Sequence, residues 1–121
     1  MSTTTKGKKR YFVKIYPELC GYYCLLSLRA RYVLTAFITM MSEEFKSGDH
    51  LRMEHAEAVY YLSHVLPQEA LRSFTSSRFS EGIKELIEHG ILRRSNFSKK
   101  VFRINSSLFN MKTVDKEKES E

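Results

Sequence analysis

Apolar residues in the first part of the chain change their spacing from two residues to three and four. The segment "YFVKIY" at 11–16 alternates its side chains and stops at Pro17, which predicts a short strand. The next segment, "ELCGYYCLLS", is apolar but interrupted by Gly21, and it predicts a helical turn or a short helix. A longer helix is predicted from Leu28 to Phe45, because apolar residues recur there at helical spacing. They are Ala30, Val33, Leu34, Phe37, Ile38, Met41 and Phe45.

Polar and small residues mark where this helix and the next one begin and end. Ser27 offers a hydroxyl as the N-cap of the long helix, and Gly48 provides a stop signal after it. The triplet "LRM" at 51–53 is compatible with a short strand. Helical spacing restarts over 54–66 and is stopped by Pro67. The apolar positions of this second helix are Ala58, Tyr61, Leu62 and Val65.

The last third of the chain predicts one more helix followed by a hairpin. Thr75 or Ser76 can cap the helix, and Gly90 ends it. Its buried face is predicted to be Phe79, Ile83, Leu86 and Ile87. Beyond Gly90, "ILRRS" and "KKVFRIN" alternate around the turn "NFSK", which indicates two antiparallel strands. The pattern leaves the register open. The inward candidates are Ile91 or Leu92 on the first strand, and Val101 with Arg103, or Phe102 with Ile104, on the second.

This order of elements is typical of a winged helix-turn-helix protein. The predicted fold class is mainly α with a small β component. It comprises three or four helices, a C-terminal β-hairpin that forms the wing, and a short N-terminal strand. At 121 residues the chain is long enough for one core and too short for two. We therefore expect a basic flexible arm at 1–10, a winged-helix domain at 11–111 and a charged flexible tail at 112–121.

The composition indicates whether the chain spans a membrane and whether it is secreted. No apolar stretch reaches the roughly 20 residues that a membrane-spanning helix needs, and no apolar signal-peptide core follows the basic start. We expect a soluble, cytoplasmic protein without a membrane partner. Cys20 and Cys24 lie four residues apart, and the simplest interpretation is two reduced side chains buried on one helix face.

The positive charge is concentrated in two parts of the chain. The net charge is +6, and residues 1–10 carry four basic residues and no acidic one. Residues 70–111 carry eight basic and three acidic residues, whereas the stretch between them is slightly acidic. This asymmetry favours a polyanion partner on one side of the fold, although chance clustering on a solvated surface is the alternative.

A winged helix that binds DNA needs cations on the hairpin for phosphates and small polar side chains at the start of the groove-reading helix. The hairpin candidates are Arg93, Arg94, Lys99, Lys100 and Arg103. The helix candidates are Ser73, Thr75, Ser76, Ser77, Arg78, Ser80 and Lys84. Glu81, Glu85 and Glu88 would repel phosphate, so the helix is expected to enter the groove by its N-terminal end. Glu81 could instead pair with Lys84 or Arg78, or accept a hydrogen bond from a cytosine.

Three segments resemble one family. "YFVKIY", "LRARYVLTAFITMM" and "GIKELIEHGILRRSNFSKKVFRINSSLF" are similar to RepL-type plasmid replication proteins of Gram-positive bacteria and related plasmid and phage regulators. The resemblance covers roughly residues 11–110. It implies double-stranded DNA binding in replication initiation or its control, with host replication proteins as further partners. The chain departs from the family pattern at Ser106 and Asn110, and "KELIEHGIL" also occurs in transcription regulators of the MarR type.

Other function classes remain as alternatives. A transcriptional repressor or a conjugative-transfer accessory protein would use the same DNA-binding fold, and a winged-helix domain can also serve protein contacts alone. We expect no enzyme, because the four histidines are scattered and no HExxH, GxSxG or Gly-rich phosphate loop occurs. We likewise expect no catalytic residue, no cofactor and no metal site. A homodimer is compatible with the long apolar helix or with the segment "GYYCLL".

Overall fold

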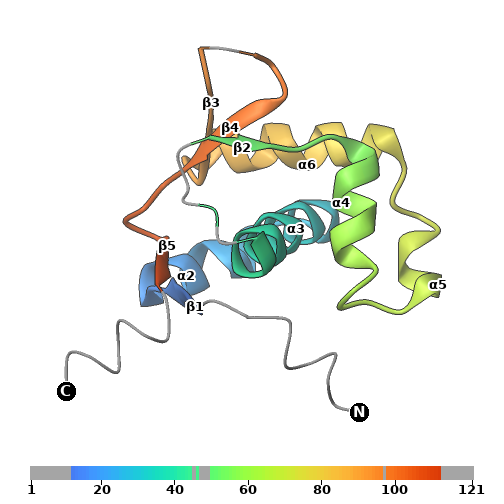
Figure 1. The fold of residues 1–121 in the computed structure, drawn as a ribbon, viewed down its shortest axis with the longest axis horizontal. Helices are drawn as coiled ribbons and strands as arrows, with labels where there is room; N and C mark the ends of the chain where they lie inside the picture. Colours follow the sequence, from blue (N-terminus) through green and yellow to red (C-terminus); the bar gives the residue numbers. More distant parts are fainter. Residues whose placement is uncertain (1–11, 45, 47–49, 97, 113–121) are drawn as a thin grey trace.

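The computed structural model describes residues 12–44, 46, 50–96 and 98–112. These residues form a mainly helical α+β fold with a small three-stranded antiparallel sheet (Figure 1). The helices are α2 (Pro17–Leu25), α3 (Leu28–Glu44), α4 (His55–Leu62), α5 (Gln68–Leu71) and α6 (Ser76–Glu88). The strands are β1 (Phe12–Ile15), β2 (Leu51–Arg52), β3 (Leu92–Arg94), β4 (Val101–Ile104) and β5 (Phe109–Lys112).

Parts of three predictions fall on residues that are not described. The basic arm at 1–10 lies outside the described residues, as do Phe45 and Gly48 at the end of the long helix. The tail does so from residue 113 onward, whereas Lys112, where the tail was expected to begin, is the last residue of β5.

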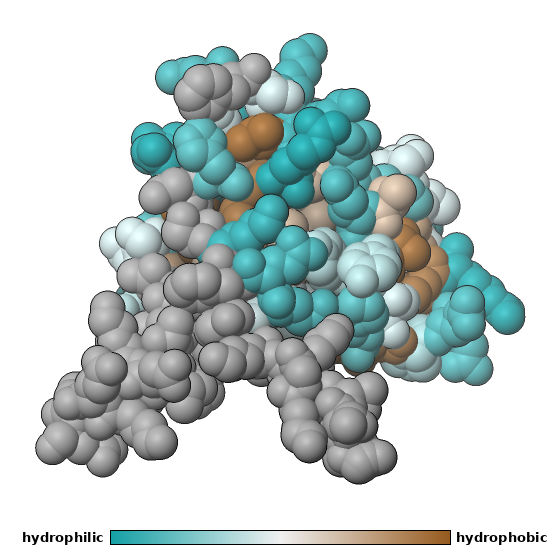
Figure 2. Space-filling model, in the orientation of Figure 1, coloured by the Kyte–Doolittle hydropathy of each residue, from teal (hydrophilic) through white to brown (hydrophobic). Residues whose placement is uncertain are grey.

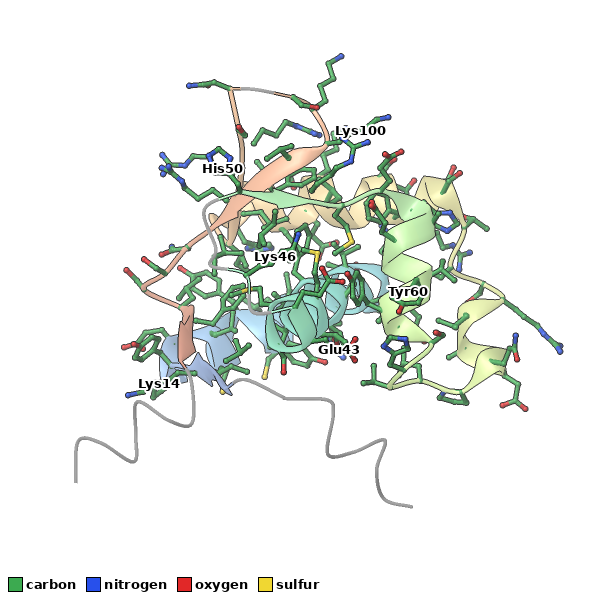
Figure 3. All side chains as sticks on the ribbon, in the orientation of Figure 1. Lys14, Glu43, Lys46, His50, Tyr60 and Lys100 are labelled. Atoms are coloured by element: carbon green, nitrogen blue, oxygen red, sulfur yellow. The ribbon has the colours of Figure 1, made fainter. Side chains whose placement is uncertain are left out.

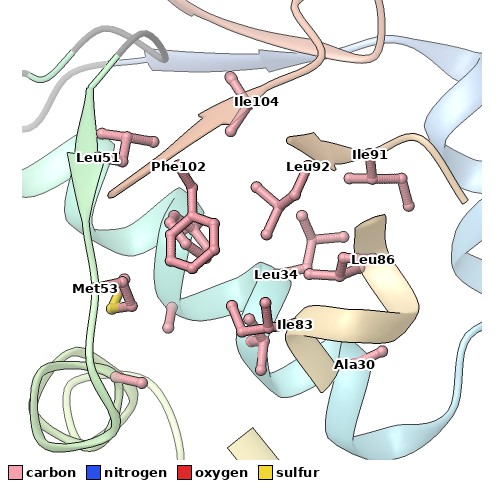
Figure 4. Packing of buried hydrophobic residues seen from close by; sticks show 14 of the residues in the cluster. Ala30, Leu34, Leu51, Met53, Ile83, Leu86, Ile91, Leu92, Phe102 and Ile104 are labelled. Atoms are coloured by element: carbon pink, nitrogen blue, oxygen red, sulfur yellow. The ribbon is translucent and has the colours of Figure 1, made fainter. Parts of the chain in front are cut away.

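Helix α3 lies at the centre of the fold because its apolar positions repeat at helical spacing. Ala30, Val33, Leu34, Phe37 and Met41 are buried as predicted, and Ile38 is half-buried. The N-cap prediction is confirmed as well, since the Ser27 Oγ accepts a hydrogen bond from the Ala30 backbone N–H at 3.4 Å. Figure 4 shows α3 side chains meeting Ile83 and Leu86 of α6 within one apolar cluster.

Helix α6 approaches α3 closely at Gly82. A Cβ atom on Gly82 would lie 2.7 Å from Val33 Cγ2 and 2.9 Å from the Arg29 carbonyl oxygen. Both distances are below any real Cβ contact, so the two backbones are as close as they are because residue 82 has no side chain. Gly90 has another role. Its φ of +75° lets the chain leave α6 through the left-handed region, as the sequence predicted.

The three-stranded sheet has the order β2-β4-β3. Leu92 pairs with Ile104, and Arg94 pairs with Phe102. Leu92, Phe102 and Ile104 are 3%, 2% and 6% exposed. The open question of register is therefore settled in favour of Phe102 and Ile104, which pack on the helices, while Arg103 is exposed.

A second sheet joins the two ends of the described chain. Strands β1 and β5 pair antiparallel, with Phe12 opposite Lys112 and Ile15 opposite Phe109. The sequence pattern predicted β1 but not β5. Leu108 and Phe109 are buried in the apolar core, and this pair anchors the start of β5.

The structure corrects several local predictions. Cys20 and Cys24 are free but exposed, because the only residue that α2 buries is Leu19. Helix α4 ends at Leu62 and the chain then turns toward Pro67, so Val65 is 48% exposed rather than buried. The short helix α5 was not predicted, and it lies in the connection between α4 and α6.

Candidate nucleic-acid interface

The N-terminal end of α6 is polar and open to solvent. The Thr75 Oγ1 accepts a hydrogen bond from the Arg78 backbone N–H at 3.3 Å, so Thr75, one of the two caps that the sequence suggested, is the N-cap. Ser73, Ser76 and Ser77 are exposed around this end. Ser77, Ser80 and Lys84 follow at spacings of three and four residues and are also exposed, so they share the solvent-facing side of the helix.

Arg78 lies on a different side of α6. Its Nη1 donates a hydrogen bond to the Ser73 carbonyl oxygen at 3.2 Å. It also lines a small cavity of about 90 Å³ with residues from the start of α3, including Leu28 and Tyr32. No ion pair between Arg78 and Glu81 occurs among the described side chains, although the spacing had suggested one.

Two of the three α6 carboxylates are turned toward α3. Glu81 forms an ion pair with Arg29, with its Oε1 at 3.2 Å from the Arg29 Nε, and not with Lys84 or Arg78 as the spacing suggested. Glu85 accepts two hydrogen bonds from Ser27, from the backbone N–H at 2.8 Å and from the hydroxyl at 2.6 Å. These two charges therefore serve the contact between the helices, although Glu81 stays partly exposed next to Lys84. Glu88 is exposed and lies four residues after Lys84, on the same side of α6.

The environment of Glu85 changes its acidity. Burial favours the protonated form, but the two hydrogen bonds from Ser27, with Arg29 nearby, outweigh it and hold the pKa of the Glu85 carboxyl below its usual value. Glu85 is thus ionised at neutral pH and fastens α6 to the start of α3.

The hairpin carries its cations on two faces. Arg93 and Arg103 are opposite each other in the β3–β4 register, and both are exposed on the face that points away from the core. Arg94 is on the other face, where its guanidinium lies 5.5 Å from the centre of the Phe102 ring and donates to the Lys99 carbonyl oxygen at 2.9 Å. Figure 3 shows Lys100 on the hairpin, at the opposite end of the molecule from Lys14.

A groove of about 240 Å³ lies between α6 and the hairpin. Ser76 and Ser80 line it on the helix side, and Arg94, Lys99 and Lys100 line it on the hairpin side. Its remaining lining comprises Met53, Glu54, His55, Phe79, Ile83 and Phe102. Hydrophilic side chains cover much of the hairpin end of the molecule in Figure 2. The structure thus brings together five predicted site residues, whereas Arg93 and Arg103 lie on the outer hairpin face.

Two residues of this groove, Glu54 and His55, were not assigned any role from the sequence. In the structure, the His55 Nε2 is 2.8 Å from the Phe74 carbonyl oxygen. Because a carbonyl oxygen only accepts, this ring nitrogen bears the hydrogen and donates the hydrogen bond. The His55 ring also packs against Phe74 and Phe79, with centroid distances of 5.6 and 6.1 Å. His55 therefore positions the chain that leads into α6, and only the tertiary fold reveals this role.

Glu54 forms two ion pairs at the other end of the groove. Its Oε2 is 2.6 Å from the Arg52 Nη2, and its Oε1 is 3.3 Å from the Lys100 Nζ. Glu54 also forms a capping box with Glu57 at the start of α4. The sequence signature of a capping box begins with Ser, Thr, Asp or Asn, so a Glu at position 54 carried no such signal and the role of Glu54 appears only in the structure.

Other candidate sites find little support. Within the described residues, no group of three His, Cys, Asp or Glu side chains is placed to hold a metal ion. In the same part of the chain, no helix has the length and apolar character to cross a membrane. No protein-family model, curated protein or solved structure matches the chain.

Proposed function

We propose that this protein is a winged helix-turn-helix domain that binds double-stranded DNA. The observation that carries the proposal is the groove between α6 and the hairpin, with Ser76 and Ser80 on one wall and Arg94, Lys99 and Lys100 on the other. Hydroxyl and amide groups at a helix start suit base edges and phosphates, and clustered cations suit the phosphate backbone.

The order of elements supports this assignment. Helix α3 is followed by β2, α4, α6 and the β3–β4 hairpin, and β2 pairs with β4 at the edge opposite β3. In the proposed complex α4 and α6 form the helix-turn-helix, α6 enters the major groove, and the hairpin is the wing. Ser77, Ser80 and Lys84 face the base edges, and Lys99 and Lys100 contact phosphates.

The positions of the α6 carboxylates also support the proposal. Of the three acidic residues that argued against a groove-reading helix, Glu81 and Glu85 contact Arg29 and Ser27 of the protein itself, whereas Glu88 is exposed. The contacts with Arg29 and Ser27 partly neutralise these two carboxylates, which reduces their repulsion of a phosphate. Because Glu88 remains exposed four residues after Lys84, entry by the N-terminal end of α6 remains the proposed geometry.

The resemblance of residues 11–110 to RepL-type replication proteins supports a plasmid or phage replication origin as the target. A promoter or a transfer origin would be read by the same surface. Selection of preferred sequences from a random duplex pool distinguishes these roles, because the selected site is expected inside an origin if the protein initiates replication. A selected site that overlaps a promoter would instead support repression.

Duplex binding itself is tested by titrating a fluorescent random duplex at several salt concentrations. The parent is expected to bind with a dissociation constant of about 10⁻⁴ to 10⁻⁶ M at physiological salt. Lys99→Ala with Lys100→Ala should weaken binding to all sequences alike and lower the salt slope by about one per lost contact. Lys14→Ala with Lys46→Ala is the matched control, since it removes the same charge away from the groove. A parent that binds no duplex would leave the protein-interaction alternative.

A further inference from the structure

A carboxylate stands inside the cationic groove, between the cations that a DNA phosphate would contact. Glu54 lies between β2 and α4, and its oxygens accept from Arg52 at 2.6 Å and from Lys100 at 3.3 Å. Lys100 is one of the residues on the hairpin wall of the groove, and Glu54 lines the same groove. A phosphate that reaches Lys100 therefore meets the Glu54 charge as well.

The backbone fixes Glu54 in this place. The Glu54 side chain accepts from the backbone N–H of Glu57, and the Glu57 Oε1 accepts from the Glu54 N–H at 2.7 Å. On the other side, the Met53 N–H donates to the Lys100 carbonyl oxygen at 2.9 Å. The residues on both sides of the ion pair are thus held by main-chain hydrogen bonds, and Glu54 cannot leave the groove without giving up its cap on α4.

The ion pairs of Glu54 with Arg52 and Lys100 contribute little to the stability of the fold. The side chains of Arg52, Glu54 and Lys100 are 56%, 39% and 54% exposed. Ion pairs this exposed contribute little to stability because water screens them and ordering the long side chains costs entropy. The capping function alone would be met by a Ser, Thr, Asp or Asn, none of which extends as far toward Lys100. The carboxylate at this position instead affects how Lys100 and Arg52 meet an outside anion.

We propose that Glu54 is a positioning residue that acts as an internal competitor of the DNA phosphates. It holds Lys100 at the groove and partly neutralises it, and it repels any phosphate that approaches. The effect limits the electrostatic, sequence-independent part of DNA binding, so that the contacts of α6 carry a larger share of the total. This inference rests on the proposed function, since it concerns the same groove.

Glu54→Gln tests the competitor role, because the amide oxygen can still accept from the Glu57 N–H while the charge is lost. Affinity for a random duplex should rise about fivefold, the factor expected when one unit charge at contact distance is removed in water. The salt slope should steepen by about one as Lys100 becomes available to phosphate. Glu69→Gln on the exposed helix α5 is the matched control, since it changes the net charge equally, and it should alter affinity less than twofold.

A double-mutant cycle with Lys100→Ala separates this role from a general charge effect. In the Lys100→Ala background, Glu54→Gln should lose at least half of its gain in affinity. If the parent binds duplex and Glu54→Gln behaves like Glu69→Gln, the competitor role is wrong and the proposed function stands. If the parent binds no duplex, both fail. If Glu54→Gln does not fold, Glu54→Asp keeps a capping carboxylate with a shorter reach, and unchanged affinity in that variant overturns the inference.

Discussion

Glu85 in the middle of α6 and Ser27 at the start of α3 are joined by two hydrogen bonds, at 2.8 and 2.6 Å, although 58 positions separate them in the chain. The Ser27 Oγ also accepts from the Ala30 N–H, so one hydroxyl caps α3 and binds α6 at the same time. The position of α6 is therefore coupled to the N-cap of the central helix α3.

Replacing Glu85 by Gln should lower the free energy of unfolding at neutral pH. It should also make this free energy fall less steeply as the pH is lowered. The folded-state pKa of Glu85 is lowered, so its contribution is present above the usual Glu pKa of about 4.3 and is lost as pH falls through the lower folded value. We expect a loss of about 1 kcal/mol at pH 7, because Glu85 is only half-buried. Urea denaturation at pH 7 and at pH 3 measures this. An equal difference from the parent at both pH values would contradict the assignment.

Leu86 should be among the most costly positions to truncate. Its side chain is fully buried between α6 and α3, and Leu86→Ala leaves a cavity that costs about 2 to 5 kcal/mol. Leu25→Ala on α2 is the control, since Leu25 is 70% exposed, and it should change stability by less than about 0.5 kcal/mol. Thermal melting of both variants provides the comparison, and a similar small shift in both would mean that the helical register of α6 is misassigned.

The glycines at 82 and 21 should respond oppositely to alanine. Gly82→Ala brings a Cβ to 2.7 Å from Val33 and 2.9 Å from the Arg29 carbonyl, and it should destabilise by about 1 to 3 kcal/mol. Gly21→Ala in α2 meets nothing within 4 Å, and it should stabilise by roughly 0.5 to 1 kcal/mol. Denaturation midpoints of the pair test this directly. If Gly82→Ala also stabilised the protein, α3 and α6 would have to be able to move apart to admit the new Cβ.

Arg78→Ala should weaken binding to every duplex without changing sequence preference. The guanidinium lies at the α3 side of α6 and donates to the Ser73 carbonyl oxygen. From there we expect it to contact the DNA phosphate backbone beside the groove rather than the edge of a guanine. Ser80→Ala is the comparison, because Ser80 lies in the groove and on the Ser77–Lys84 side. Affinities for the selected site and for random duplex are measured for both variants. A loss of sequence preference in Arg78→Ala would instead show that the Arg78 guanidinium contacts a base edge.

Local spacing predicted those parts of the structure that depend on neighbouring residues. Helix α6, its Thr75 cap and its end at Gly90 follow from caps, periodicity and one glycine. The exposure of Cys20 and Cys24 could not be predicted in this way, because an apolar helix contains no information about how much of the fold is available to cover it.

The groove was predictable in its residue types and not in its geometry. Clustered cations indicated Lys99 and Lys100, and the polar start of α6 indicated Ser76 and Ser80. Alternation along a strand could have separated Arg93 from Arg94, but only once the register was known, since a shift of one residue exchanges the two faces. Partners distant in sequence, such as Glu54 with Lys100 and Glu81 with Arg29, depend on tertiary contacts alone.

The pairing of β1 with β5 means that the chain enters and leaves the domain at one edge, while the hairpin lies at the other (Figure 1). A segment attached through either strand starts far from the groove and does not need to cross it. Such a domain can be inserted into a surface loop of another protein, or its ends can be joined by a short linker and new ends opened elsewhere. Its architecture therefore suits it for use as a portable module in engineered fusions.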